Sequence, residues 1–176
     1  MRRTAAATIA GIVSGLVAGV LGRIAMRIVA VVRGDVPDFT ITGTIGILLV
    51  FLLMGGALAL VFAIVARGNP ARPGPGWWSL AGAGLLAGVV LLTPLRSELA
   101  GRAAFIALFL PVGLLLGWGS AWLTLVISRW LPEPGGAGRY LYGLLAAPAI
   151  LATVAVPALL VFGILQSIGV IPIPNQ

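Results

Sequence analysis

The chain has 176 residues, of which 60% are hydrophobic and 9% are charged. Because a soluble domain carries about 25% charged residues, this composition indicates one integral membrane domain over residues 1–176 and excludes a separate soluble domain. The net charge of +7 comes from arginines scattered between apolar runs. It therefore indicates membrane topology rather than nucleic-acid binding.

The residue types from which enzymes commonly build active sites are scarce in this chain. It contains no cysteine and no histidine, which excludes disulfides, thiolate metal sites and the commonest general base. A phosphate-binding loop would need lysine, and an intramembrane serine protease would need a histidine partner for its serine. We therefore expect a protein that is not an enzyme and that binds no cofactor or metal.

Uncharged apolar runs divide the chain and predict an all-α integral membrane bundle. About 20 apolar residues cross about 30 Å of hydrocarbon, so each run is long enough for one transmembrane helix. The five predicted helices span residues 7–32, 42–66, 77–95, 104–129 and 140–168. Prolines and glycines between most of these runs indicate loops, because both residues end helices.

Arginines near the helix ends predict the orientation of the bundle. Six of them fall on the side of the N-terminus: Arg2, Arg3, Arg67, Arg72, Arg129 and Arg139. Three fall on the opposite side: Arg33, Arg96 and Arg102. Because arginine-rich loops stay in the cytoplasm, we expect an N-in, C-out protein of a bacterial cytoplasmic membrane. Its first helix is expected to remain as an uncleaved anchor.

Small residues recur every fourth position in the first predicted helix, at Ala7, Gly11, Gly15 and Gly19. In a membrane, such a stripe favours close helix packing, because small residues let two backbones approach. The stripe predicts a packing face but does not say whether the partner is another helix of this chain or another subunit.

Arg23 and Arg27 continue the same spacing towards the outer end of that helix. An unpaired charge deep in a span costs about 2.5–3.5 kcal/mol, so we expect Arg23 to pair, with Glu98 or Asp35. The other members of this predicted outer cluster are Asp38 and Arg96. Two roles stay open: ion pairs that fix helix packing, or a site that attracts an anion.

Threonines at positions 40, 42 and 44 open the second predicted helix in the same outer layer. Threonine is a natural N-cap, and its hydroxyl can also bond the preceding turn of a membrane helix. We therefore expect these hydroxyls to cap the start of this helix.

Residues 15–27 (GLVAGVLGRIAMR) align without gaps on residues 84–96 (GLLAGVVLLTPLR). The match is compatible with a duplicated helix pair related by an axis along the membrane normal. Chance similarity between helices rich in glycine, leucine, alanine and valine is the competing explanation.

The segment GRIAMRIVAVVRGDVPDFTITGTIGIL resembles small multi-pass membrane proteins of high-GC bacteria, a group with no assigned function. The likeness covers the first two predicted helices, and it implies a membrane location and a helical fold without implying any activity.

Two functions are compatible with these patterns. The first is a non-enzymatic structural or accessory subunit that packs through its first helix, embedded in the lipid bilayer and assembled as a homo-oligomer or in a larger membrane complex. The second is a small channel or carrier that uses the outer arginines to attract a small anionic solute. A carrier would need a polar cavity from Arg23 towards the cytoplasm, whereas an accessory subunit would have a dry, ion-paired cluster.

Overall fold

A computed structural model describes residues 2–32, 34, 40–68, 74–92, 99–133 and 138–167 of the chain. Within these residues, the regular structure is entirely helical, as predicted. The helices are α1 (Arg2–Val32), α2 (Ile41–Gly68), α3 (Pro75–Leu92), α4 (Leu99–Trp130) and α5 (Gly138–Ser167). Three described segments are long and apolar enough to span a membrane: Arg2–Val31, Ile41–Arg67 and Phe105–Trp130.

The predicted helix positions agree with the structure except at the ends. Helix α1 begins at Arg2 and α4 at Leu99, about a turn before the apolar runs begin, because polar residues can extend a helix beyond its apolar part. Helix α3 is described as far as Leu92, and residues 93–95 of the predicted helix lie outside the described residues. Helix α4 continues through Pro111.

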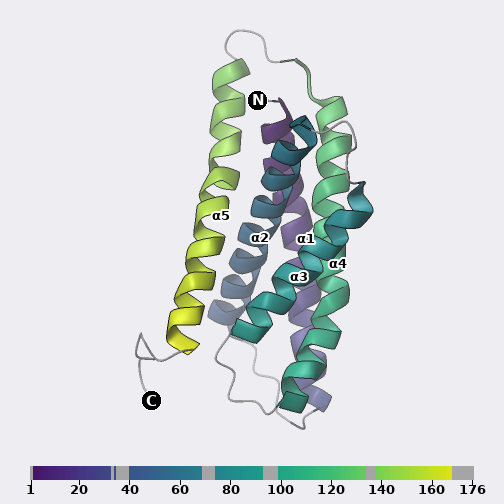
Figure 1. Cartoon of the computed structure of the whole chain (residues 1–176), viewed down its shortest axis with the longest axis vertical. Coiled ribbons are helices and arrows are strands. Elements are labelled where there is room, and N and C mark those ends of the chain that lie inside the picture. The colour runs from purple at the N-terminus through teal and green to yellow at the C-terminus, as the bar shows by residue number, and fades with distance from the viewer. Residues whose placement is uncertain are drawn as a thin grey trace.

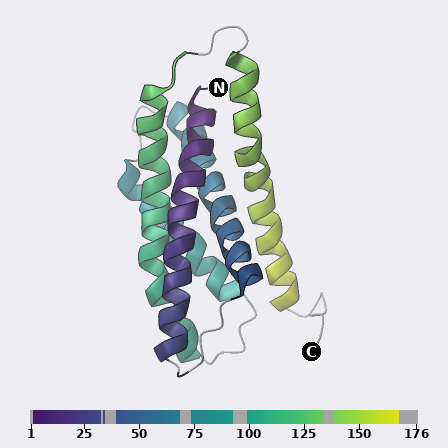
Figure 2. The same cartoon turned by 180° about the vertical axis from the view of Figure 1, so that it is seen from behind.

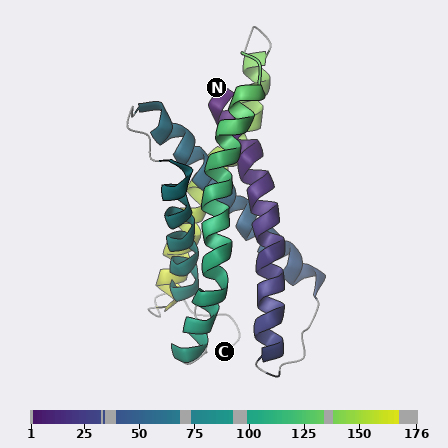
Figure 3. The same cartoon turned by 90° about the vertical axis from the view of Figure 1, so that its right-hand side faces the viewer.

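The helices alternate in direction along an elongated bundle (Figure 1). Helices α1, α3 and α5 run one way, and α2 and α4 run the other, so α1 begins at the end of the bundle where α2 and α4 finish. Seen from behind, α1 lies between α4 and α2, and α5 stands beside α2 (Figure 2). The side view shows α2 running obliquely past α1, with α3 packed along α4 (Figure 3).

The interior combines bulky side chains in one half of the bundle with alanines in the other. Phe51, Met54, Phe109 and Leu116 belong to one buried cluster, which joins α2 to α4. Nearer the start of α1, four buried alanines pack α1 against α2: Ala7, Ala10, Ala59 and Ala63. Because alanine has no side chain beyond Cβ, helix axes packed through it can lie close together.

Candidate functional site

The glycine stripe of α1 lies directly against the backbone of α2. A Cβ atom added to Gly11 would come within 2.6 Å of the Cα of Gly56, and one added to Gly15 within 2.6 Å of the carbonyl oxygen of Phe51. In the opposite direction, a Cβ on Gly55 would come within 3.1 Å of the Cα of Gly15. The sequence did not indicate whether the stripe contacts this chain or another subunit. In the structure, its partner is helix α2 of the same chain.

Further along α1, side chains of α2 replace its backbone as the nearest atoms. A Cβ on Gly19 would lie 2.9 Å from the Cδ2 of Leu48, and one on Gly22 would lie 2.8 Å from the ring of Phe51. The two helices thus make backbone contact at Gly11 and Gly15 and are separated by side chains beyond them.

A regular register connects these contacts to the two arginines. Going along α1, the α2 residues whose Cα atoms lie nearest to Gly11, Gly15 and Gly19 step back by four each time: Gly56, Leu52 and Leu48. If the register continues for two more steps, we expect Arg23 to lie level with Thr44 and Arg27 level with Thr40.

The first turn of α2 is itself positively polarised, because its backbone N–H groups have no partners within the helix. Arg23 is half-buried with its Nε excluded from solvent, whereas Arg27 is exposed. The Thr44 hydroxyl donates to the Thr40 carbonyl over 3.0 Å, which is a bond to the preceding turn and not an N-cap. A helix N-terminus with arginines expected at the same level of the neighbouring helix favours an anion.

No protein-family model, curated protein or solved structure matches this chain. Its function is therefore inferred from its own residues.

The remaining members of the predicted outer cluster cannot be placed beside these arginines. Asp35, Asp38, Arg96 and Glu98 lie outside the described residues. The pairing of Arg23 with Glu98 or Asp35 stays a prediction.

A second close backbone contact, which the sequence analysis missed, joins α3 to α4. A Cβ on Gly117 would overlap the carbonyl oxygen of Trp78, and one on Gly113 would come within 2.8 Å of the Cα of Ala83. Gly82 faces the same two glycines. The spacing of Gly113 and Gly117, four residues apart, is the small-residue signal that could have revealed this contact.

The two aligned segments of the proposed sequence repeat have different surroundings in the structure. Gly15 and Gly19 face α2, but their aligned counterparts Gly84 and Gly88 have nothing within 4 Å of an added Cβ. In α3 it is Gly82, two positions earlier, that contacts another helix. The aligned glycines therefore have different roles, which favours chance similarity.

Buried hydroxyls hold α1 against α4 at the middle of the bundle. The Ser14 and Ser120 hydroxyls lie 2.8 Å apart, and both residues are buried. Ser14 also donates to the Ala10 carbonyl over 2.7 Å, and Thr124 donates to the Ser120 carbonyl over 2.6 Å. Because these hydroxyls are satisfied within the protein, they act as interhelical and intrahelical bonds rather than as the lining of a pore.

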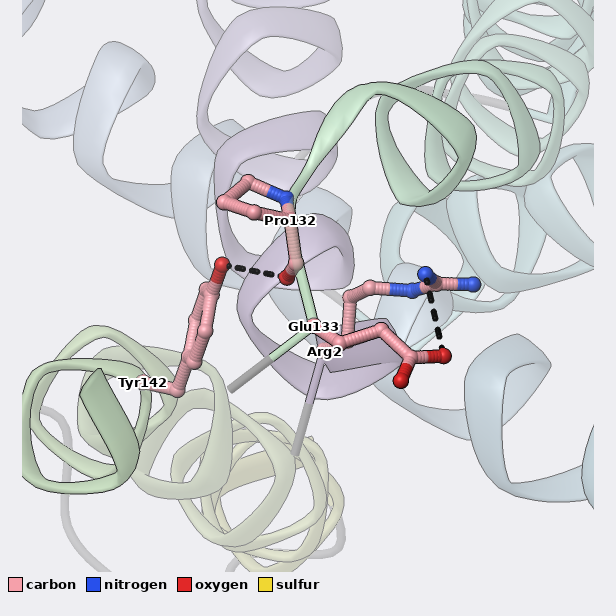
Figure 4. A network of polar contacts seen from close by, with 4 residues as sticks. All are labelled: Arg2, Pro132, Glu133 and Tyr142. Carbon is pink, nitrogen blue, oxygen red and sulfur yellow. Dashed lines mark hydrogen bonds and ion pairs between the residues drawn. The ribbon is translucent and has the colours of Figure 1, made fainter. Parts of the chain in front are cut away.

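Polar contacts at the end where α1 begins link α1 to α2, and link both α1 and α5 to the residues that follow α4. Arg3 donates to the carbonyl of Ala66 in the last turn of α2 over 3.3 Å. Figure 4 shows Arg2 facing Glu133 at 4.0 Å, and the Tyr142 hydroxyl donating to the Pro132 carbonyl at 2.9 Å. The exposed aromatic side chains Trp77, Trp130 and Tyr140 are suited to the interfacial layer of a membrane.

We expect Arg23→Ala to destabilise the protein more than Arg27→Ala. The loss at Arg23 should be about 1.5–3 kcal/mol, because a half-buried guanidinium leaves charge-assisted bonds unmade when it is removed. The exposed Arg27 should cost about 0.5 kcal/mol or less. Unfolding of the two variants in a mild detergent measures the difference.

Double variants test the partner of Arg23. If Glu98 or Asp35 pairs with it, Arg23→Ala combined with Glu98→Ala or Asp35→Ala should cost less than the sum of the single losses, because neither charge is then left buried alone. Strict additivity in both double variants, or equal losses for Arg23→Ala and Arg27→Ala, would contradict the pairing.

Proposed function

We propose that the chain is a five-span protein of a bacterial cytoplasmic membrane, N-in and C-out, that serves as a non-catalytic structural or accessory subunit. The observation that carries this proposal is the contrast between the two faces of α1. Its glycine face is covered by α2, whereas large apolar side chains along the rest of its length are exposed, among them Ile12, Val17, Val20 and Val31. A continuous exposed apolar surface of this kind requires lipid or another protein chain around it.

The buried polar groups support a non-catalytic role. The buried polar side chains of the described residues are hydroxyls: Thr8, Ser14, Ser120, Thr124 and Ser128. Each takes part in a hydrogen bond to the backbone of its own helix or to a facing hydroxyl. These hydrogen bonds stabilise the helices and their packing.

A protein partner would have to use a surface other than the glycine stripe. One such surface lies where α1 meets α4, around a groove of about 170 Å³ whose walls include Val17 and Gly119. Trp118 and Trp122 stack beside it with ring centroids 5.5 Å apart, and both are partly exposed. Apolar grooves flanked by exposed tryptophan are suited to a facing helix, from a second copy or from a larger complex.

The alternative function, an anion channel or carrier, is favoured by the positive first turn of α2 and by the expectation that Arg23 and Arg27 lie at its level. It also needs a polar route from Arg23 to the end where α1 begins. The groove between α1 and α4 has no arginine among its described wall residues, and neither has the larger groove lined by Met26 and Phe105. The buried hydroxyls of Ser14 and Thr124 are already hydrogen-bonded within the bundle.

The proposed topology is tested by reporter fusions after Gly74, between α2 and α3, and at Gln176. With five spans and an N-in orientation, the Gly74 fusion should report the cytoplasm and the Gln176 fusion the outside, because an odd number of crossings separates the termini. A cytoplasmic signal at Gln176 would contradict the five-span topology.

The accessory role is tested by purifying the protein in a gentle detergent and measuring the mass of the assembly. A defined homo-oligomer or a stoichiometric partner supports the proposal. A monomer that transports a small anion in proteoliposomes would instead establish the carrier function.

A further inference from the structure

An apolar groove of about 400 Å³ opens in the half of the bundle away from the start of α1. It is formed by the last part of α1, the first part of α2, the last part of α3 and the first part of α4. Its wall residues are Met26, Gly43, Gly46, Ile47, Val50, Phe51, Met54, Leu86, Val89, Phe105 and Phe109. No charged or hydroxyl side chain is among these described wall residues, so the groove suits a hydrocarbon chain.

The length of the groove corresponds to one leaflet of a bilayer. Along α2 its wall runs from Gly43 to Met54, which at 1.5 Å per residue is about 16 Å. The hydrocarbon core of a membrane is about 30 Å thick, so the groove covers about half of it. A lipid acyl chain entering from one side of the membrane has this reach.

The groove wall begins at the positive end of a helix, with Arg27 next in sequence to one of its wall residues. Gly43 belongs to the first turn of α2, where the helix dipole is positive. Arg27 follows the wall residue Met26 directly and is exposed. A guanidinium has five N–H donors, so it can bind a phosphate while it keeps contacts within the protein.

We propose that this groove binds an anionic phospholipid. One acyl chain lies along α2 between Gly43 and Met54, and the phosphate is held by Arg27 and the first turn of α2. Arg23, one helical turn before Arg27, adds to the same positive potential. The inference rests on the membrane insertion proposed above, and it assigns the outer arginines an anion that comes from the bilayer itself.

Gly46 provides a means to fill the groove without disturbing the helix contacts. It lines the groove, and a Cβ added to it would meet nothing within 4 Å. Gly46→Leu therefore places a branched side chain where the acyl chain would lie. Gly84→Leu is the matched control, because Gly84 is exposed on α3, has nothing within 4 Å of its added Cβ and is not part of the groove wall.

The experiment measures lipid retained by the detergent-purified protein, by native mass spectrometry, after addition of phosphatidylglycerol or phosphatidylcholine at equal concentration. The unchanged protein and Gly84→Leu should retain phosphatidylglycerol in preference to phosphatidylcholine. Gly46→Leu should lose about tenfold in affinity for phosphatidylglycerol. Arg27→Gln should lose about tenfold for the anionic lipid alone, the equivalent of one charge-assisted hydrogen bond. Should Gly46→Leu fail to fold, Gly46→Val fills less of the groove and should show a smaller loss in the same direction.

Two results would overturn the proposal: equal retention of phosphatidylglycerol by Gly46→Leu and Gly84→Leu, or equal retention of the two lipids by the unchanged protein. Displacement of the bound lipid by inorganic phosphate alone would also overturn it, since the acyl chain would then contribute nothing. Extraction of the unchanged protein from cell membranes with alkaline carbonate tests membrane insertion separately from the lipid site. Release from the membrane refutes insertion and the lipid site together, whereas a retained protein without lipid preference refutes the lipid site alone.

Discussion

Gly15→Leu is expected to lower the free energy of unfolding by about 3 kcal/mol, at the upper end of the usual cost of overpacking. A Cβ at this position would already come within 2.6 Å of the Phe51 carbonyl oxygen and 2.8 Å of the Cα of Leu52. Both are backbone atoms, so they can move only if α2 moves away from α1. The separation would also remove van der Waals contacts along the helix pair, which supply much of the stability of helix packing in a membrane.

Thermal or denaturant unfolding of the purified protein in detergent measures this loss, with Gly84→Leu as the control. The control adds the same side chain to a glycine with open space around its Cβ, and it should change the stability by about 0.5 kcal/mol or less. Equal stabilities for the Gly15 and Gly84 variants would show that α1 and α2 do not pack through the stripe.

Gly117→Ala is expected to destabilise the protein by about 1–3 kcal/mol, even though it adds only one methyl group. The added Cβ would overlap the carbonyl oxygen of Trp78 and come within 3.0 Å of the backbone nitrogen of Gly82. Helix α3 would have to shift along or away from α4, and the edge-to-face contact between Phe62 and Trp78, with centroids 5.4 Å apart, would be disturbed.

Gly119→Ala supplies the matched control on the same helix. Its nearest neighbour would be the Cβ of Ser14 at 3.5 Å, an ordinary contact distance. In a helix interior, alanine is also more favourable than glycine by about 1 kcal/mol. Gly119→Ala should therefore leave the stability unchanged or raise it slightly. Unfolding in detergent, with tryptophan fluorescence as the probe, compares the two variants. An equal loss of stability in Gly119→Ala and Gly117→Ala would contradict the close backbone contact between α3 and α4 at Gly117.

Several levels of this structure could be predicted from the sequence. The scarcity of charged residues and the five apolar runs predict the helices, and their positions differ from the structure mainly at the ends. The four-residue spacing of Gly11, Gly15 and Gly19 predicts a packing face, and these glycines do face another helix. Both patterns can be recognised in the sequence because they depend on local properties, namely helix length and the absence of side chains at regular intervals.

The same reasoning could not predict which helix the glycine stripe contacts. Lipid and a neighbouring helix are equally apolar, so a membrane helix carries no hydrophobic contrast between its lipid-facing and protein-facing sides. For the same reason Gly82 and Gly84 are not distinguished by sequence, although one contacts α4 and the other has open space.

The sequence by itself determined that this protein is a bundle of apolar helices. It also determined that the first helix carries a stripe of small residues, with two arginines beyond the far end of that stripe. Only the tertiary structure decided that this stripe of α1 packs against α2. It also decided that segments of α1, α2, α3 and α4 together form an apolar groove. The physical reason is that backbone contact and groove shape depend on how helices cross, which is decided by residues far apart in the chain.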